Sequence, residues 1–202
     1  MAARLRIFTS VAPDLRAERE IIGRAIAGLP VSLGWVINYT PSADEALGPA
    51  LDAVAAADFY VILLGTDIRA PMGSEFVVAR RTGKRILAYV KNVLHTPAAR
   101  VFVRDASVNW IHVSAEEELG PLVQRGLAEQ ILQGAESYGI SPLDWETLSA
   151  LLAQLRDQEQ PAPEEEERPP GYRGVGKDAV IVSPGRDLPR DGVLIEKAKG
   201  SN

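Results

Sequence analysis

Short apolar runs and amphipathic stretches alternate along residues 1–156. The run FYVILLG at 59–65 has no apolar–polar alternation, so both of its faces should be buried, as in the centre of a parallel sheet. The other runs have β-branched and aromatic residues typical of strands. We therefore predict strands at about 5–10, 33–39, 59–65, 85–90 and 109–113.

Helix signals lie between the first four of these runs. Pro13-Asp14 is a favourable helix start after the first strand. Ser42 and Glu45 have the spacing of a capping box for a second helix, in which Pro49 predicts a kink or a late start. A third helix contains GSEF and ends at Gly83.

The rest of the folded region continues the alternation after a longer segment. Residues of about 91–107 are predicted as a long connection to the fifth strand. Ser114 and Glu117 form a second capping box, for a helix that runs to about Gly134. Ser141-Pro142 opens a last amphipathic helix. Its apolar face consists of Leu148, Leu151, Leu152 and Leu155.

The order of these elements specifies a fold class. Strands that alternate with helices, joined by right-handed crossovers, form a doubly wound parallel sheet. We predict an α/β, flavodoxin-like fold over 1–156 with strand order 2-1-3-4-5. The acidic, Pro/Gly-rich segment 157–176 is predicted to be a linker, because it has too little apolar surface to form a core. Residues 177–202 are predicted to be an extended tail or a β-hairpin.

Composition narrows the function classes. The chain of 202 residues has no cysteine, which excludes disulfides and thiolate chemistry. Its two histidines, His95 and His112, would need carboxylates to bind zinc. The net charge of −5 gives no reason to expect nucleic acid or an anionic membrane as the main partner. No apolar stretch is long enough for a signal peptide or a membrane span, so we expect a cytoplasmic protein.

Polar residues gather in the loops that follow the first and third strands. In a doubly wound sheet, ligands bind beyond the carboxyl ends of the strands, where the strand order reverses. For the order 2-1-3-4-5 this crevice lies between strands one and three, beside the loops 9–14 and 65–75. The candidate site residues in these loops are Thr9, Ser10, Asp14, Asp67, Arg69, Ser74 and Glu75.

Glu75 has two interpretations. The sequence suggests that it lies in the first turn of its helix, where the positive end of the helix dipole favours the ionised form that a nucleophile needs. Helix electrostatics alone would also account for it, because a first-turn acid contributes about 0.3–1 kcal/mol without any function. Asp14 and Asp67 have similar structural interpretations as cap and turn residues.

The stretch GSEFVVARRTGKRILAYV resembles the active-site helix of nucleoside 2-deoxyribosyltransferases. In that family a glycine stands two residues before the nucleophilic glutamate, an alanine stands four after it, and Gly-Lys opens the next strand. The matching residues here are Gly73, Glu75, Ala79, Gly83 and Lys84. The transferases usually have an aromatic and an acidic residue after strand one, and TSVAPD supplies only the acid.

The stretch RIFTSVAPDLRAERE is similar to the first strand and helix of TIR-like domains, including uncharacterised bacterial ones. Ser10, Asp14, Leu15, Glu18 and Arg19 carry this resemblance. Both families imply a flavodoxin-like fold and a glutamate that acts on an N-glycosidic bond. Together the two resemblances cover about residues 5–115.

These resemblances imply an N-glycosidase or a transferase, with Glu75 as nucleophile. Asp67 or Asp14 would hold ribose hydroxyls or assist as acid or base, and Asp67 is the second catalytic candidate. Arg69 would bind a phosphate, while Thr9, Ser10 and Ser74 would bind substrate. We expect a nucleoside or nucleotide substrate, NAD among the possibilities, and no cofactor or metal.

The alternative is a non-catalytic module. TIR-like domains also serve as interaction or nucleotide-sensing domains, and the tail 177–202 would suit a homo-oligomer or a partner protein. Its apolar runs AVIV and GVLI would dock on a sheet edge by strand addition. A C-terminal extension that is disordered throughout is the other possibility.

Overall fold

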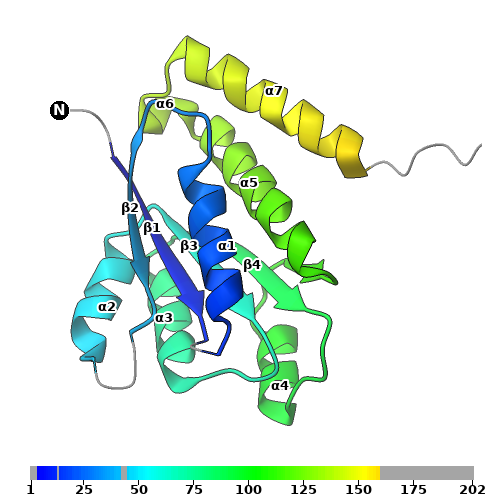
Figure 1. Cartoon of the computed structure of the whole chain (residues 1–202). Helices are drawn as coiled ribbons and strands as arrows, with labels where there is room; N and C mark the ends of the chain where they lie inside the picture. The colour runs from blue at the N-terminus through cyan, green and yellow to red at the C-terminus, as the bar shows by residue number, and fades with distance from the viewer. Residues whose placement is uncertain (1–3, 13, 42–44, 160–202) are drawn as a thin grey trace, which may run out of the picture. The chain divides into compact units, whose positions relative to one another are not determined.

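Five parallel strands form the centre of the molecule (Figure 1). The structure is a computed structural model that describes residues 4–12, 14–41 and 45–159, all within one compact unit. The sheet has the order β2-β1-β3-β4-β5. Its strands are β1 (Arg4–Val11), β2 (Gly34–Tyr39), β3 (Phe59–Leu64), β4 (Arg85–Lys91) and β5 (Trp110–Val113). The predicted strands, their order and the central place of 59–65 are confirmed.

Helices cover both faces of the sheet, which makes this a doubly wound α/β fold of the flavodoxin-like kind. One face carries α1 and α5, and α7 packs on the outside of α5 (Figure 1). The other face carries α2, α3 and α4. The helices are α1 (Arg16–Ala27), α2 (Leu47–Ala55), α3 (Ala70–Arg81), α4 (Pro97–Asp105), α5 (Glu116–Gln133), α6 (Ala135–Tyr138) and α7 (Pro142–Glu159).

The strands bury side chains on both faces because helices lie on both sides. All six residues of β3 are buried, which explains its unbroken apolar sequence. Ile7 and Phe59 face α1 and α5, whereas Phe8 and Tyr60 face α2 and α3. Successive side chains of a strand point to opposite faces, so Thr9 and Ser10 also lie on different sides of the sheet.

The starts of α2 and α5 test the predicted capping boxes. The helix α2 begins only at Leu47, which puts Pro49 in its first turn, where the missing N–H breaks no helical hydrogen bond. The expected late start is therefore confirmed, although Ser42 of the predicted capping box lies outside the described residues. At α5 the glutamate that accepts a hydrogen bond from the backbone before the helix is Glu118, and not Glu117 as predicted. The Oε2 atom of Glu118 accepts from the N–H of Ser114 at 2.9 Å.

The predicted long connection of about 91–107 contains a helix, α4, whose position was not predicted. Thr96 caps α4 by accepting a hydrogen bond from the N–H of Ala99 at 3.2 Å, and Pro97 takes the first helical position. This Thr-Pro pair is a recognisable helix start. The nine residues of α4 are too few for a strong periodic signal, which is why the pattern alone missed it.

The last helix begins where it was predicted to. Ser141 caps α7 through the N–H of Asp144 at 3.1 Å. Leu148, Leu152 and Leu155 are buried, and α7 packs on α5. The helix continues to Glu159, so residues 157–159 belong to it and not to the predicted linker. The rest of the linker and the tail 177–202 lie outside the described residues. Among the described helices, none is both long and apolar enough to span a bilayer.

Candidate functional site

The carboxyl ends of β1 and β2 and the helix α3 bring three polar side chains together at the switch point of the sheet. Ser10 lies near the end of β1, and Thr40 follows β2 directly. The N–H of Thr40 donates to the carbonyl of Thr9 at 3.2 Å, which continues the pairing of the two strands and fixes the position of Thr40. Glu75 approaches from α3 on the same face as Ser10.

Both hydroxyl groups donate to one oxygen of Glu75. The Oε2 atom accepts from Ser10 Oγ at 2.6 Å and from Thr40 Oγ1 at 2.9 Å. Glu75, Ser10 and Thr40 are all buried, and Glu75 has an exposed fraction of 0%. The other oxygen, Oε1, is also buried and has no hydrogen-bond partner in the part of the chain that the structure describes. The carboxyl group is therefore oriented by two donors on one side and unsatisfied on the other.

Burial raises the pKa of Glu75 above its usual range, while the hydrogen bonds from Ser10 and Thr40 act in the opposite direction. Tyr60 lies beneath this cluster, and its ring stacks on Phe8 with the ring centres 6.0 Å apart. Burial also raises the pKa of the Tyr60 hydroxyl, and the nearby Glu75 adds to that effect. Burial thus works against ionisation of both side chains.

Glu75 does not lie in the first turn of its helix, which corrects the prediction. The helix α3 begins at Ala70, and Pro71 is accommodated in the first turn, where no N–H is required. Glu75 is consequently the sixth helical residue, and the first turn has no acidic residue. Since the dipole effect fades beyond the first turn, helix electrostatics do not explain this glutamate.

Asp67 is not part of the cluster. Its Oδ1 accepts hydrogen bonds from the Thr96 hydroxyl and from the backbone N–H of Ile68, which ties the loop after β3 to the start of α4. The expected open crevice shared by Glu75, Ser10 and Asp67 is also absent from the described residues. Glu75 has no exposed surface, because Ser10, Thr40 and the surrounding core cover it.

The remaining predicted residues lie at or near the same edge of the sheet but point elsewhere. Arg69 pairs with Asp14 at 3.3 Å, with both side chains more than half exposed. Ser74 is exposed on α3. Thr9 is buried on the α1 face, where its Oγ1 has no partner among the described residues. Of the seven predicted residues, the structure therefore places only Ser10 and Glu75 in the cluster, while Arg69 and Asp14 form a separate ion pair.

Thr40 is the site residue that the sequence prediction missed. The prediction considered only the loops after strands one and three, although β2 ends at the same edge as its neighbour β1. A threonine directly after a strand and before Pro41 is a signal that could have been used.

The cluster is a buried carboxyl group held by two hydroxyls. The chain matches no protein-family model and no curated protein. A proposal for its function therefore has to be argued from the side chains described above. Among the described residues, no group of three or more His, Cys, Asp or Glu side chains is placed to hold a metal ion.

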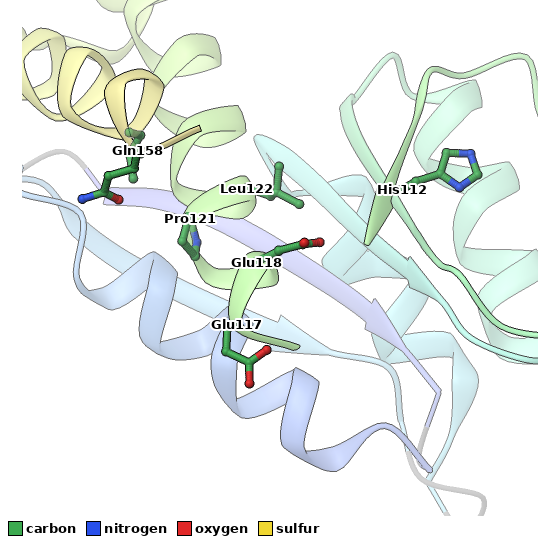
Figure 2. A pocket seen from close by; sticks show the side chains of 7 residues that line it. His112, Glu117, Glu118, Pro121, Leu122 and Gln158 are labelled. Carbon is green, nitrogen blue, oxygen red and sulfur yellow. The ribbon is translucent and has the colours of Figure 1, made fainter. Parts of the chain in front are cut away.

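A separate pocket of about 530 Å³ lies where α5 begins and α7 ends (Figure 2). Glu117 and Glu118 leave the first turn of α5 in different directions, and His112 comes from β5. Glu118 is already used as a helix cap, and His112 Nδ1 contacts Asn92 Oδ1 at 2.9 Å. The pocket is lined by His112, Glu117, Glu118, Pro121, Leu122, Leu155 and Gln158, and it includes no residue of the Glu75 cluster.

Proposed function

We propose that this domain binds a nucleoside or nucleotide at the Glu75 cluster and cleaves its N-glycosidic bond, with Glu75 as the nucleophile. The observation that carries the proposal is the unsatisfied Oε1 of a fully buried carboxyl group at the switch point of the sheet. A buried polar atom without a partner is costly and is retained mainly where a ligand or a reaction requires it.

A sugar hydroxyl would complete the cluster. It is both a donor and an acceptor, so it would satisfy Oε1 whether Glu75 is ionised or protonated. Ser10 and Thr40 would keep Oε2 fixed, which leaves Oε1 as the oxygen that faces the sugar. The resemblance of residues 73–84 to the transferase helix points to the same residue as the reacting group.

The proposed reaction needs only a carboxylate and water. As the bond between the anomeric carbon and the base nitrogen breaks, its electron pair leaves with the base. The base of a nucleoside takes up the proton that the attacking water later releases, whereas the nicotinamide of NAD leaves as a neutral molecule and that proton goes to solvent. Glu75 Oε1 forms a bond to the anomeric carbon, which has gained oxocarbenium character. Attack by water on this carbon breaks its bond to Glu75, gives the free sugar and restores the carboxylate. Capture by a second base would instead give transfer.

The raised pKa of Glu75 adds a requirement for this reaction. Burial works against ionisation of the resting carboxyl group, so substrate binding has to favour the ionised form. The positive charge that develops on the sugar would do so, because an opposite charge within about 4–6 Å stabilises a carboxylate. Because Glu75 has no exposed surface, substrate entry would also require part of the buried shell around it to open. The roles suggested for Asp67, Asp14 and Arg69 remain predictions.

Base release from NAD and from purine and pyrimidine nucleosides tests the proposal. The purified chain should release free base, measured by liquid chromatography, and Glu75→Gln should lower the rate about 100-fold or more. Glu20→Gln, the same chemical change at an exposed position on α1, is the control for non-specific effects. Equal release by the Gln variant would exclude Glu75 as the nucleophile.

A second candidate function is a non-catalytic interaction or nucleotide-sensing module. The complete burial of Glu75 favours it, because a purely structural polar cluster needs no access from solvent. This candidate predicts no base release from any nucleoside. It also predicts that Glu75→Gln has no effect on assembly, which the tail 177–202 would mediate.

A further inference from the structure

An apolar hollow of about 680 Å³ lies between α3 and α4. Val77 of α3 and Val101 of α4 are 45% and 46% exposed in it, which is unusual for two valines on neighbouring helices. Phe76 and Phe102 form its floor, with their rings edge to face at 5.0 Å. The hollow is therefore a concave apolar surface with two aromatic side chains in its floor.

The opposite side of the sheet shows how such a surface is covered. There, α7 packs on α5 and buries Leu148, Leu152 and Leu155, so an amphipathic helix forms a third layer (Figure 1). No described helix covers the hollow between α3 and α4 in the same way. The two faces of the sheet thus differ by one helical layer.

Charge around the hollow has the opposite sign to that of the chain. The helices α3 and α4 carry four exposed arginines, at positions 80, 81, 100 and 104, against one exposed acid, Asp105. Arg104 and Asp105 pair with each other at 2.7 Å, which leaves three arginines in excess. Arg80 and Asp105 line the hollow itself. The chain as a whole has a net charge of −5, so this is a local basic region on an acidic protein.

We propose that the hollow between α3 and α4 binds an amphipathic helix of a partner protein that carries apolar residues on one face and carboxylates beside them. The concave shape fits a helix, as in the known helix-in-groove mode, and fits a flat lipid surface poorly. The arginines would pair with the carboxylates. A symmetric pair of copies joined here would instead bring arginines of equal charge together, which disfavours a homodimer through this face.

Binding of a designed helix tests the proposal on the full chain. The probe is a fluorescein-labelled peptide of about 18 residues, with leucines at helical spacing on one face and glutamates on its flanks. Fluorescence anisotropy should show saturable binding that weakens at high salt. Val77→Glu and Val101→Glu should each weaken binding about tenfold or more, because each places a carboxylate in the apolar contact. Both should melt near the wild-type temperature, since both positions are nearly half exposed.

Two matched controls distinguish binding at this site from non-specific hydrophobic binding of the peptide. Leu143→Glu changes a 73% exposed leucine at the start of α7 and should leave binding unchanged. A peptide with lysines in place of the glutamates should bind more weakly. No saturable binding up to about 1 mM, or equal binding by Val101→Glu, would overturn the proposal. So would a dimer, or binding to phosphatidylserine vesicles, that Val101→Glu abolishes, because another occupant would then fill the hollow.

Discussion

At the scale of single residues, Glu75 combines complete burial with incomplete hydrogen bonding. Burial favours its neutral form, whereas the hydroxyls of Ser10 and Thr40 favour the ion, and burial is the larger effect on the pKa. In the unfolded chain the carboxyl group would be hydrated and titrate normally. Folding therefore binds a proton more tightly at this position, and stability should depend on pH.

Replacing Glu75 by Gln should remove that dependence. With the folded pKa raised, the stabilising contribution of Glu75 is complete below the pKa of the unfolded carboxyl group. It is lost as pH rises towards the folded pKa. Urea unfolding between about pH 4 and pH 8 should show Glu75→Gln gaining stability relative to wild type as pH rises. Parallel curves would contradict this, and Glu20→Gln on exposed α1 surface is the control.

The pairing of Ser10 with Glu75 could be anticipated from the sequence, because both loops follow strands that end at one edge. The helix position and the burial of Glu75 were predicted less well. Glu75 was wrongly predicted in the first turn of its helix, because Pro71 was taken as part of the preceding loop. Proline is in fact compatible with a helix start. The burial of Glu75 depends on Thr40, which lies 35 residues away, and no local pattern reports such contacts.

At the scale of elements, hydrogen bonds at the start of α7 connect this outer helix to the rest of the fold. The carboxylate of Asp144 in the first turn of α7 accepts from the Ser32 hydroxyl at 2.6 Å and from the Ser32 N–H at 2.8 Å. It also accepts from the Ser141 hydroxyl at 2.7 Å. These bonds, led by the one from the Ser32 hydroxyl, lower the pKa of Asp144. One carboxylate thus holds the capping serine of α7 and joins the helix to the segment before β2.

Loss of this carboxylate should loosen the third layer. Asp144→Ala should lower the free energy of unfolding by about 2 kcal/mol, since three hydrogen bonds to a charged acceptor disappear. Urea denaturation followed by circular dichroism measures the change. Glu146→Ala, at an exposed position on the same helix, should have little effect, and an equal loss in both variants would show that helix propensity is the cause.

At the scale of the whole molecule, the fold requires the helix α5 to approach the sheet closely. A Cβ atom on Gly126 would lie 2.6 Å from Leu87 Cδ2 and 2.7 Å from the Tyr89 hydroxyl. Both residues are buried, and the Tyr89 hydroxyl donates to the carbonyl of Leu122 at 3.1 Å, so neither side chain can easily move. Strand and helix order could be predicted from the sequence, but such a distance between layers could not, because it depends on residues from separate elements.

Two glycines of α5 should therefore respond oppositely to alanine. Gly126→Ala should destabilise the protein by about 1–3 kcal/mol through overpacking against β4. A Cβ on Gly120 would be 3.6 Å from Ile21, an ordinary contact, so Gly120→Ala should stabilise by up to about 1 kcal/mol through helix propensity. Chemical denaturation distinguishes the two outcomes. Stabilisation by both changes would mean that α5 does not contact the sheet as described.

The place of β1 between β2 and β3 has a consequence for synthesis of the chain. Ile7 pairs with Ile37 on one side and with Phe59 on the other, so its second partner is made 52 residues later. At about 5–20 residues per second, the apolar segment 4–11 leaves the ribosome roughly 3–10 s before the strand that completes its hydrogen bonding. During that interval the edge of β1 that later pairs with β3 is unpaired even if β2 already occupies the other edge. It has to be protected from pairing with other chains, for example by molecular chaperones.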